Sequence, residues 1–275
     1  MGKPLVYLVF GSLGSGRRSV VADLIEFGAE MGSSTKVFVS GADWEGQELD
    51  LGTKSRESVI SEYALADKGL GIPGYVEEGD MCFVVADGRS DPADFMEAFS
   101  WWLSENEAEL GRVITVMDCA LCAEKSKVLV WYDCCIYFSD IVLLANRHGV
   151  SPKWVGDLQE KYKKELCYPC MFEFVKKGRV GNPALVLDPT ARRMTGIFDD
   201  PRDYMDVDED PASQDSAAAS EEEDVTFYDM SPEDAEQAFE EMDEREVPAV
   251  NDPYLEKLPS GRRAKVLPDI RKLLG

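Results

Sequence analysis

A short glycine-rich segment near the start of the chain carries the clearest chemical signal in the sequence. Residues 11–19 read GSLGSGRRS, with Gly11 and Gly16 five positions apart. Glycines at this spacing let successive backbone N–H groups point inward at the oxygens of a phosphate group. A helix that begins directly after them adds a favourable partial positive charge. The alternative is a glycine-rich turn that holds no ligand. The residues expected to form the phosphate site are Gly11, Gly14, Ser15, Gly16, Arg17, Arg18 and Ser19.

Two positions of this loop differ from the usual pattern, in which Lys and then Ser or Thr follow the second glycine. Arg17 stands at the Lys position, and a guanidinium group pairs well with phosphate. Arg18 stands where a hydroxyl group would ligate Mg²⁺, and its side chain cannot hold a cation. Ser19 supplies that hydroxyl only if the loop shifts by one residue. Phosphate contact is therefore expected at this loop, whereas Mg²⁺ is not expected in the usual place.

The cysteines and the single histidine give weaker signals. Two Cys-x-x-Cys pairs, Cys119/Cys122 and Cys167/Cys170, have the spacing of zinc ligands. The first pair follows one expected strand and the second precedes another, so the pairs should lie at opposite ends of a parallel sheet. A typical strand spans about 17–20 Å, which Zn–S bonds of about 2.3 Å cannot bridge. No zinc cluster and no other metal site is expected. His148 is either an exposed loop residue or a contact to a nucleotide base.

Alternating apolar segments and helical patterns must position the loop. Short apolar runs predict buried strands at residues 4–10, 36–39, 81–86, 113–117, 141–144, 171–175 and 184–187. Helical spacing predicts helices at residues 17–31, 57–66, 92–103 and 154–165. Asp91 is the expected N-cap of the third helix, with Pro92 at its first position. Strands that alternate with helices indicate βαβ units. We therefore expect an α/β fold over residues 1–198, with a mainly parallel sheet flanked by helices.

Charge divides the chain into three parts. The net charge is −24, and residues 199–246 alone hold 21 acidic and 2 basic residues. Residues 199–250 are therefore expected to form an acidic, mostly disordered linker, with a helix start at Ser231 that favours a helix over 231–245. Residues 251–275 are basic and rich in apolar side chains.

The same composition bears on partners and location. Nucleic-acid binding is disfavoured because phosphate contact along a strand needs clustered Lys and Arg. No segment reaches the roughly 18 consecutive apolar residues of a membrane span. An odd number of cysteines within apolar runs, and an N-terminus without a signal-peptide pattern, predict a cytoplasmic protein with reduced thiols.

Five segments, taken together, resemble the CobW family of P-loop GTPases, relatives of the nickel-enzyme maturation proteins HypB and UreG. The loop GSLGSGRRS is similar to the family's GFLGSGKTT, and VFVSGADWEGQELD at 37–50 is similar to its second-strand segment. Three later family segments are similar to DGRSDPADFMEAF at 87–99, VITVMD at 113–118 and DIVLLANRHGVS at 140–151, in the same order. The resemblance implies a P-loop domain that binds GTP, GDP or another nucleotide. It also implies that Asp87, Asn146 and His148 join the loop residues around that nucleotide.

Several family positions have changed. Val85 stands where the family has a Glu, and residues 51–80 contain no cysteine where the family has its metal motif. The guanine-reading Asn-Lys-x-Asp falls on Ala145 to His148 and therefore lacks its carboxylate. We accordingly expect a nucleotide-binding protein with weak or no hydrolysis. Two alternatives remain open: a pseudo-NTPase scaffold that engages a protein partner through residues 231–274, and a metallochaperone, as the resemblance implies.

Overall fold

The central strands are built from apolar segments that are buried on both faces. In the computed structural model, the predicted places hold β1 (Leu5–Phe10), β5 (Met81–Val85), β6 (Glu109–Asp118) and β7 (Ile141–Ala145). Every residue of β7 is buried, and so are the last five residues of β1. Burial on both sides is typical of parallel strands that have helices on either face.

The structure describes residues 3–28, 34–44, 58–66, 69–72, 76–77, 80–199 and 252–274. The described residues 3–196 and 252–274 belong to one compact unit. The acidic linker expected at 199–250, with its helix at 231–245, falls almost wholly outside the described residues and stays a prediction.

Nine strands of the described residues form one sheet in the order β4-β3-β2-β5-β1-β6-β7-β8-β9. The remaining strands are β2 (Thr35–Ser40), β3 (Val59–Ala66), β4 (Gly69–Gly71), β8 (Met171–Lys176) and β9 (Arg179–Val180). Neighbouring strands pair in parallel except for the outermost pairs, β3 with β4 and β8 with β9. In the centre, Val9 lies opposite Val85 on one side and Ile114 on the other. The expected α/β fold with a mainly parallel sheet is therefore confirmed.

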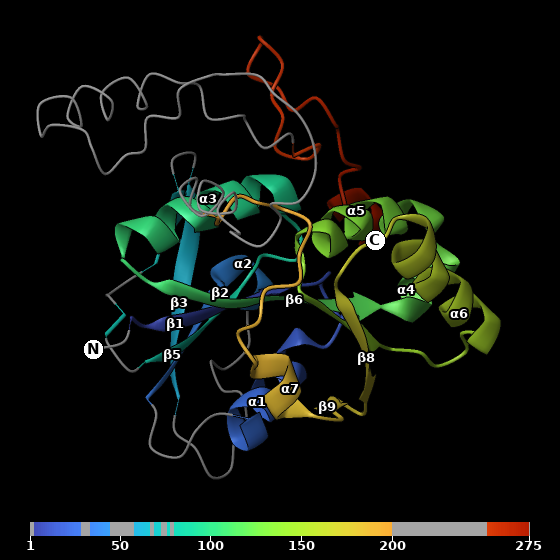
Figure 1. The fold of residues 1–275 in the computed structure, drawn as a ribbon, viewed down its shortest axis with the longest axis horizontal. Coiled ribbons are helices and arrows are strands. Elements are labelled where there is room, and N and C mark those ends of the chain that lie inside the picture. The colour runs from blue at the N-terminus through green and yellow to red at the C-terminus, as the bar shows by residue number, and fades with distance from the viewer. Residues whose placement is uncertain are drawn as a thin grey trace, which may run out of the picture. The chain divides into compact units, whose positions relative to one another are not determined.

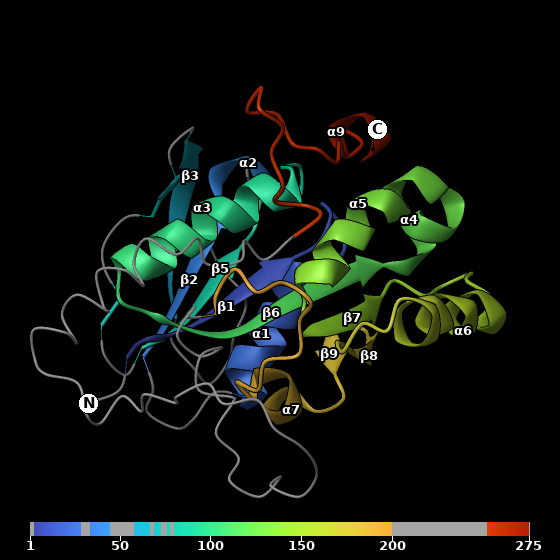
Figure 2. The ribbon, with the colours of Figure 1, turned by 45° about the horizontal axis from the view of Figure 1, so that its top comes forward.

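Helices cover both faces of this sheet. Figures 1 and 2 show α3 and α5 on one face and α1 and α7 on the other. The helices are α1 (Arg17–Gly28), α2 (Gly41–Trp44), α3 (Pro92–Glu105), α4 (Cys119–Glu124), α5 (Ser126–Phe138), α6 (Pro152–Glu160), α7 (Pro183–Leu187) and α9 (Arg271–Leu274). A π-helical turn, Lys161–Glu165, continues α6.

The predicted cap of α3 is confirmed, because the Asp91 side chain accepts a hydrogen bond from the backbone N–H of Ala93 at 2.9 Å. Within the described part of the chain, none of the helices has the length and apolar character needed to span a membrane.

Two predicted elements are wrong in type. The helix expected at 57–66 is strand β3, whose Tyr63 is buried and donates a hydrogen bond to the carbonyl of Val85 at 2.8 Å. Pairing with β2 and this core contact outweigh local helix propensity. The strand expected at 184–187 is helix α7, which Asn182 caps through the backbone N–H of Leu185. A short apolar run does not distinguish a strand from a buried helix.

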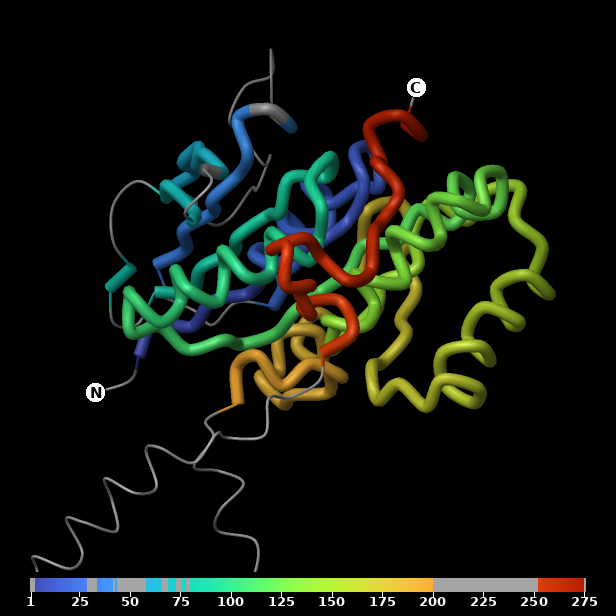
Figure 3. The backbone as a smooth tube through the Cα atoms, turned by 90° about the horizontal axis from the view of Figure 1, so that it is seen from above, coloured from blue at the N-terminus to red at the C-terminus, as the bar shows by residue number. Residues whose placement is uncertain are grey.

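The described C-terminal residues 252–274, which we call the C-terminal strap, lie across α3 and α5 (Figure 3). Tyr254 is buried, and its ring centroid lies 5.1 Å from that of Tyr137 in α5. The Arg263 guanidinium contacts Asp94 at 2.9 Å and Glu97 at 2.8 Å, both in α3. The basic end of the chain is therefore bound within the chain by acidic groups of α3.

Candidate phosphate-binding site

The glycine-rich loop connects β1 to α1, as predicted. Gly14 and Gly16 adopt positive φ angles of 82° and 95°, a region that side chains other than that of glycine rarely occupy. The backbone N–H of Ser15 donates to the carbonyl of Ser12 at 3.1 Å, which closes the turn. The Ser15 hydroxyl is fully buried and, among the described residues, finds no hydrogen-bond partner. The loop thus holds a buried polar atom that no described residue satisfies, and such atoms call for an explanation.

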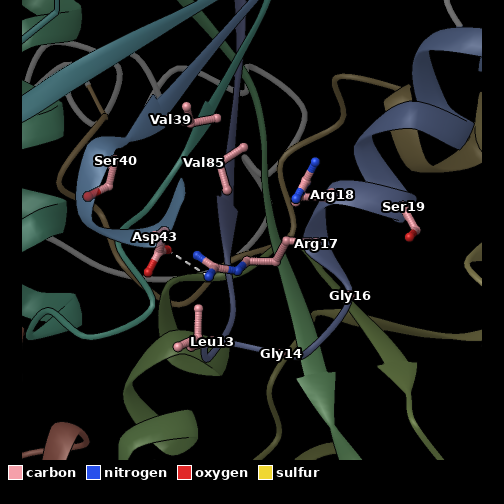
Figure 4. A pocket seen from close by; sticks show the side chains of 10 residues that line it. All are labelled: Leu13, Gly14, Gly16, Arg17, Arg18, Ser19, Val39, Ser40, Asp43 and Val85. Carbon is pink, nitrogen blue, oxygen red and sulfur yellow. Dashed lines mark hydrogen bonds and ion pairs between the residues drawn. The ribbon is translucent and has the colours of Figure 1, made fainter. Parts of the chain in front are cut away.

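A cavity of about 610 Å³ opens beside this loop, on the side of β2 and β5 (Figure 4). Its lining consists of Leu13, Gly14, Gly16, Arg17, Arg18, Ser19, Val39, Ser40, Asp43 and Val85. Five predicted site residues therefore share one cavity. The other five predicted site residues are not part of its lining within the described chain: Gly11, Ser15, Asp87, Asn146 and His148.

Arg17 is committed to protein partners. Its side chain is only 6% exposed, and its Nη2 lies 2.7 Å from Asp43 Oδ2. Its Nη1 donates a hydrogen bond to the carbonyl of Ala86. Figure 4 shows the guanidinium group reaching across the cavity toward Asp43. The predicted phosphate contact therefore needs Arg17 either to leave Asp43 or to be shared with it.

Asp43 is a site residue that no motif in the sequence identified. It lies in α2, directly after β2, and its Oδ2 also accepts the backbone N–H of Gly88 at 2.8 Å. Its Oδ1 is buried and has no partner among the described residues. The only signal available in the sequence was an acid that closely follows an expected strand, and such acids are common.

Asp87, which the family resemblance had indicated, lies beside Asp43. Its carboxylate accepts hydrogen bonds from Ser40 Oγ at 3.3 Å and from the backbone N–H of Arg89 at 2.9 Å. Burial, and then the negative charge of Asp43, raise the pKa of Asp87. The carboxyl groups of Asp43 and Asp87 thus lie close together, and the guanidinium of Arg17 pairs with Asp43. This part of the site disfavours a further negative charge until a carboxyl group takes up a proton.

Gly88 permits the close approach of these groups. A Cβ atom at this position would lie 2.6 Å from Arg17 Nη2 and 2.6 Å from the backbone nitrogen of Leu13. Any larger residue would push the segment after β5 away from the loop. No local sequence pattern marks Gly88, because this close approach depends on two strands that are distant in sequence.

The loop after β7 holds the predicted base-side residues. Asn146 Nδ2 donates to Asp118 Oδ2 at 2.7 Å and to the carbonyl of Gly14 at 3.1 Å, so it supports the phosphate loop from its other side. His148 is exposed. Arg147 places its guanidinium carbon 4.2 Å from the ring centroid of Phe174. Asn146 thus provides an amide group, and Arg147 and Phe174 provide planar groups on which a base could stack.

The cysteine pairs lie apart. Strands β6, β7 and β8 run in parallel. Cys119 directly follows the end of β6 and Cys170 directly precedes the start of β8, so they lie at opposite ends of these strands. Burial raises the pKa of both thiols to about 12, so they stay protonated at neutral pH. Cys167 is exposed. Across the described ranges, no three His, Cys, Asp or Glu side chains gather in a way that would hold a metal ion.

Comparison with known proteins gives a distant likeness. No protein-family model matches the chain, and no curated protein matches its sequence. Among solved structures, a zinc-bound triple mutant of the YjiA GTPase is similar at 14% identity and a TM-score of 0.44, over 72% of this chain. This chain spans 63% of the length of that structure. The zinc-bound YjiA GTPase from E. coli is similar at 14% identity and a TM-score of 0.36, over 70% of this chain and 67% of the other.

Proposed function

We propose that this chain is a P-loop protein that binds a nucleotide through its phosphate groups at residues 11–19. It hydrolyses that nucleotide weakly or not at all. The observation that carries the proposal is the buried, unpartnered hydroxyl of Ser15 within a loop whose glycines adopt positive φ angles. Buried polar groups in folded proteins are nearly always satisfied. A phosphate oxygen at the mouth of the loop would accept this hydroxyl together with the backbone N–H groups.

Weak hydrolysis follows from the charges around the loop. Phosphoryl transfer needs cations that neutralise the charge of the transition state. Arg17, at the position of the usual lysine, is already paired with Asp43. Arg18 replaces the Mg²⁺-binding hydroxyl, and the apolar Val85 lines the cavity where the related family has a carboxylate. The site therefore supports binding better than catalysis.

Base selectivity is expected to be poor. Guanine-reading loops use a carboxylate to accept the N–H groups of the base, and residues 145–149 contain none. Asn146 is already bonded to Asp118 and Gly14. The Arg147 and Phe174 side chains offer stacking, and stacking does not distinguish guanine from adenine.

Titration calorimetry with GTP, GDP, ATP and ADP, each with and without Mg²⁺, tests the proposal. We expect binding of both purine nucleotides, little dependence on Mg²⁺ and negligible phosphate release.

Gly16→Val should abolish binding, because Gly16 has a φ of 95°. Gly156→Val in α6 is the matched control, since a Cβ there meets no atom within 4 Å. Brisk, Mg²⁺-dependent and GTP-selective turnover would contradict the proposal, and so would unchanged binding by Gly16→Val.

The alternatives concern residues that the structure describes only in part. A protein partner for residues 231–251 stays a prediction, because they lie outside the described residues. Residues 252–274 are engaged within the chain through Tyr254 and Arg263, so a partner would have to displace them. The metallochaperone hypothesis stays a prediction as well.

A further inference from the structure

Tyr132 of α5 places its hydroxyl group against the start of the phosphate-binding loop, and its side chain is fully buried. The hydroxyl oxygen accepts hydrogen bonds from the backbone N–H of Ser12 at 3.0 Å and of Asp118 at 3.1 Å. It also lies 2.9 Å from Ser12 Oγ and 3.3 Å from the carbonyl oxygen of Val116. One oxygen atom thus joins the first part of the loop to the end of β6.

A second connection between the same two segments runs through Asn146. The carboxylate of Asp118 accepts a hydrogen bond from Asn146, which also donates to the carbonyl of Gly14. The other oxygen of Asp118 caps α4 through the backbone N–H of Leu121 at 2.9 Å. The loop is therefore attached near Ser12 and at Gly14, and both attachments lead to Asp118.

We infer that Tyr132 is a positioning residue for the phosphate-binding loop, whose hydroxyl holds the loop in the shape that lets its N–H groups converge on a phosphate. A hydroxyl oxygen has two acceptor sites, and the N–H groups of Ser12 and Asp118 use both. The phenolic proton is left for Val116 or for Ser12 Oγ. Without this oxygen, two N–H groups at the base of the loop lose their acceptor, and the loop shifts to find others.

This inference rests on the proposed function, and Tyr132→Phe in the full chain tests it. Tyr7→Phe is the matched control, because Tyr7 is equally buried and its hydroxyl donates to the carbonyl of Leu187 at 2.6 Å, on the face that carries α7. Both variants should lower the melting temperature. Only Tyr132→Phe should weaken GDP binding, by about tenfold or more, in calorimetry performed well below both melting temperatures.

Two further readouts separate positioning from general stability. In ligand-free Tyr132→Phe, the amide hydrogens of Ser12 and Asp118 should exchange faster, while those of the central strands other than Asp118 keep their order of protection. In a double-mutant cycle on GDP affinity, Ser12→Ala combined with Tyr132→Phe should lose less than the sum of the single losses. Unchanged GDP affinity in Tyr132→Phe, or an equal loss in Tyr7→Phe, overturns the inference.

Failure of the proposed function gives a different result. If the wild-type chain binds no GDP, the proposed function is wrong, and exchange in the ligand-free protein decides the role of Tyr132. Unaltered exchange of Ser12 and Asp118 then overturns the inference, and faster exchange supports it. If Tyr132→Phe does not fold, 3-fluorotyrosine at position 132 keeps the hydroxyl group as a weaker acceptor, and the same two comparisons apply.

Discussion

Two aspartates stand at opposite ends of β5 and have opposite electrostatic surroundings. Asp80, before the strand, accepts hydrogen bonds from Lys36 at 2.6 Å and from the backbone N–H of Glu77 at 2.7 Å. Burial alone would raise its pKa, but the hydrogen bonds from Lys36 and Glu77 outweigh burial and lower it. Asp87, after the strand, is half-buried beside Asp43, and both its partial burial and the charge of Asp43 raise its pKa. The same strand therefore begins at a stabilised carboxylate and ends at a destabilised one.

The same difference in electrostatic surroundings distinguishes the amino ends of the strands, called the amino edge of the sheet, from their carboxyl ends, called the carboxyl edge. Asp140, just before β7, is fully buried and accepts hydrogen bonds from the backbone N–H groups of Val113 at 2.8 Å and Arg192 at 2.5 Å. Arg193 lies 3.2 Å from it. Asp43, at the other edge, keeps one oxygen without a partner in the described chain. The carboxylates at the amino ends of the strands stabilise the fold, whereas Asp43 and Asp87 at the carboxyl ends repel each other, and uptake of a proton would relieve that repulsion. Ligands of open α/β sheets bind at the carboxyl ends of the strands.

The largest expected effect is at the amino edge. Asp140→Ala should lower the free energy of unfolding by about 3–5 kcal/mol, because it removes a buried carboxylate that accepts two backbone N–H groups and pairs with Arg193. Urea denaturation at pH 7 measures it. Asp188→Ala is the comparison variant, since Asp188 is 49% exposed and lies 3.6 Å from Arg112. That variant should lose about 1 kcal/mol or less, and equal losses would remove the proposed difference between the buried and the exposed partner.

Arg17→Met should have the second-largest effect, about 2–3 kcal/mol at pH 7. It leaves Asp43 without its guanidinium partner, but Asp87, whose pKa is raised, can take up a proton and so remove the repulsion between the two carboxylates. The loss should therefore shrink as the denaturation is repeated at decreasing pH from 7 to 4. A loss that stays constant over this series would show that Asp87 does not take up a proton there.

Asp87→Asn should give a smaller effect of opposite sign. Because the folded protein binds a proton at Asp87 more tightly than the unfolded chain does, the wild type loses stability as pH rises through the pKa of Asp87. The amide should therefore raise stability at pH 7–8 and flatten its pH dependence. Asp80→Asn should instead lower stability at neutral pH, because a lowered pKa contributes stability that is present at neutral pH and is lost on acidification. Denaturation series from pH 2 to 8 compare the two variants, because the contribution of Asp80 is lost only below its ordinary pKa of 3.8.

The smallest expected effect is on anion affinity. Sulfate keeps its charge over this pH range, so its binding reports on the site alone. Protonation of Asp87 removes one negative charge near the loop, so in a series from pH 8 to 4 sulfate should bind a few-fold more tightly below the raised pKa of Asp87 than above it. Asp87→Asn should abolish the difference, whereas His148→Ala should keep it. A pH dependence that His148→Ala removes would assign the effect to the histidine.

The parts of this site that were predictable are those encoded by local sequence. The run before Gly11 gives β1, the glycines give the loop, and Asp91 with Pro92 gives the start of α3. The pairing of Arg17 with Asp43 was not predictable, because an arginine at the lysine position reads as a phosphate contact until its tertiary partner is known.

Other site residues depend on pairs of distant segments. Tyr132 reaches the loop from α5, and Gly88 touches Leu13 across neighbouring strands. No local pattern marks such contacts. The same limit explains the element at 57–66, where pairing with β2 decides in favour of a strand.

The C-terminal strap has a consequence for the order in which the chain acquires its structure during synthesis. Ribosomal synthesis delivers α5 long before Tyr254, and domains tend to fold as their segments emerge. Until Tyr254 is made, the rings of Tyr137 and Phe138 that it covers stay without this partner. A nascent chain can therefore pair β1 with β5 and β6 and still present an aromatic surface to chaperones. The strands of the sheet are all synthesised before Tyr254, so this surface gains the Tyr254 contact only near the end of synthesis.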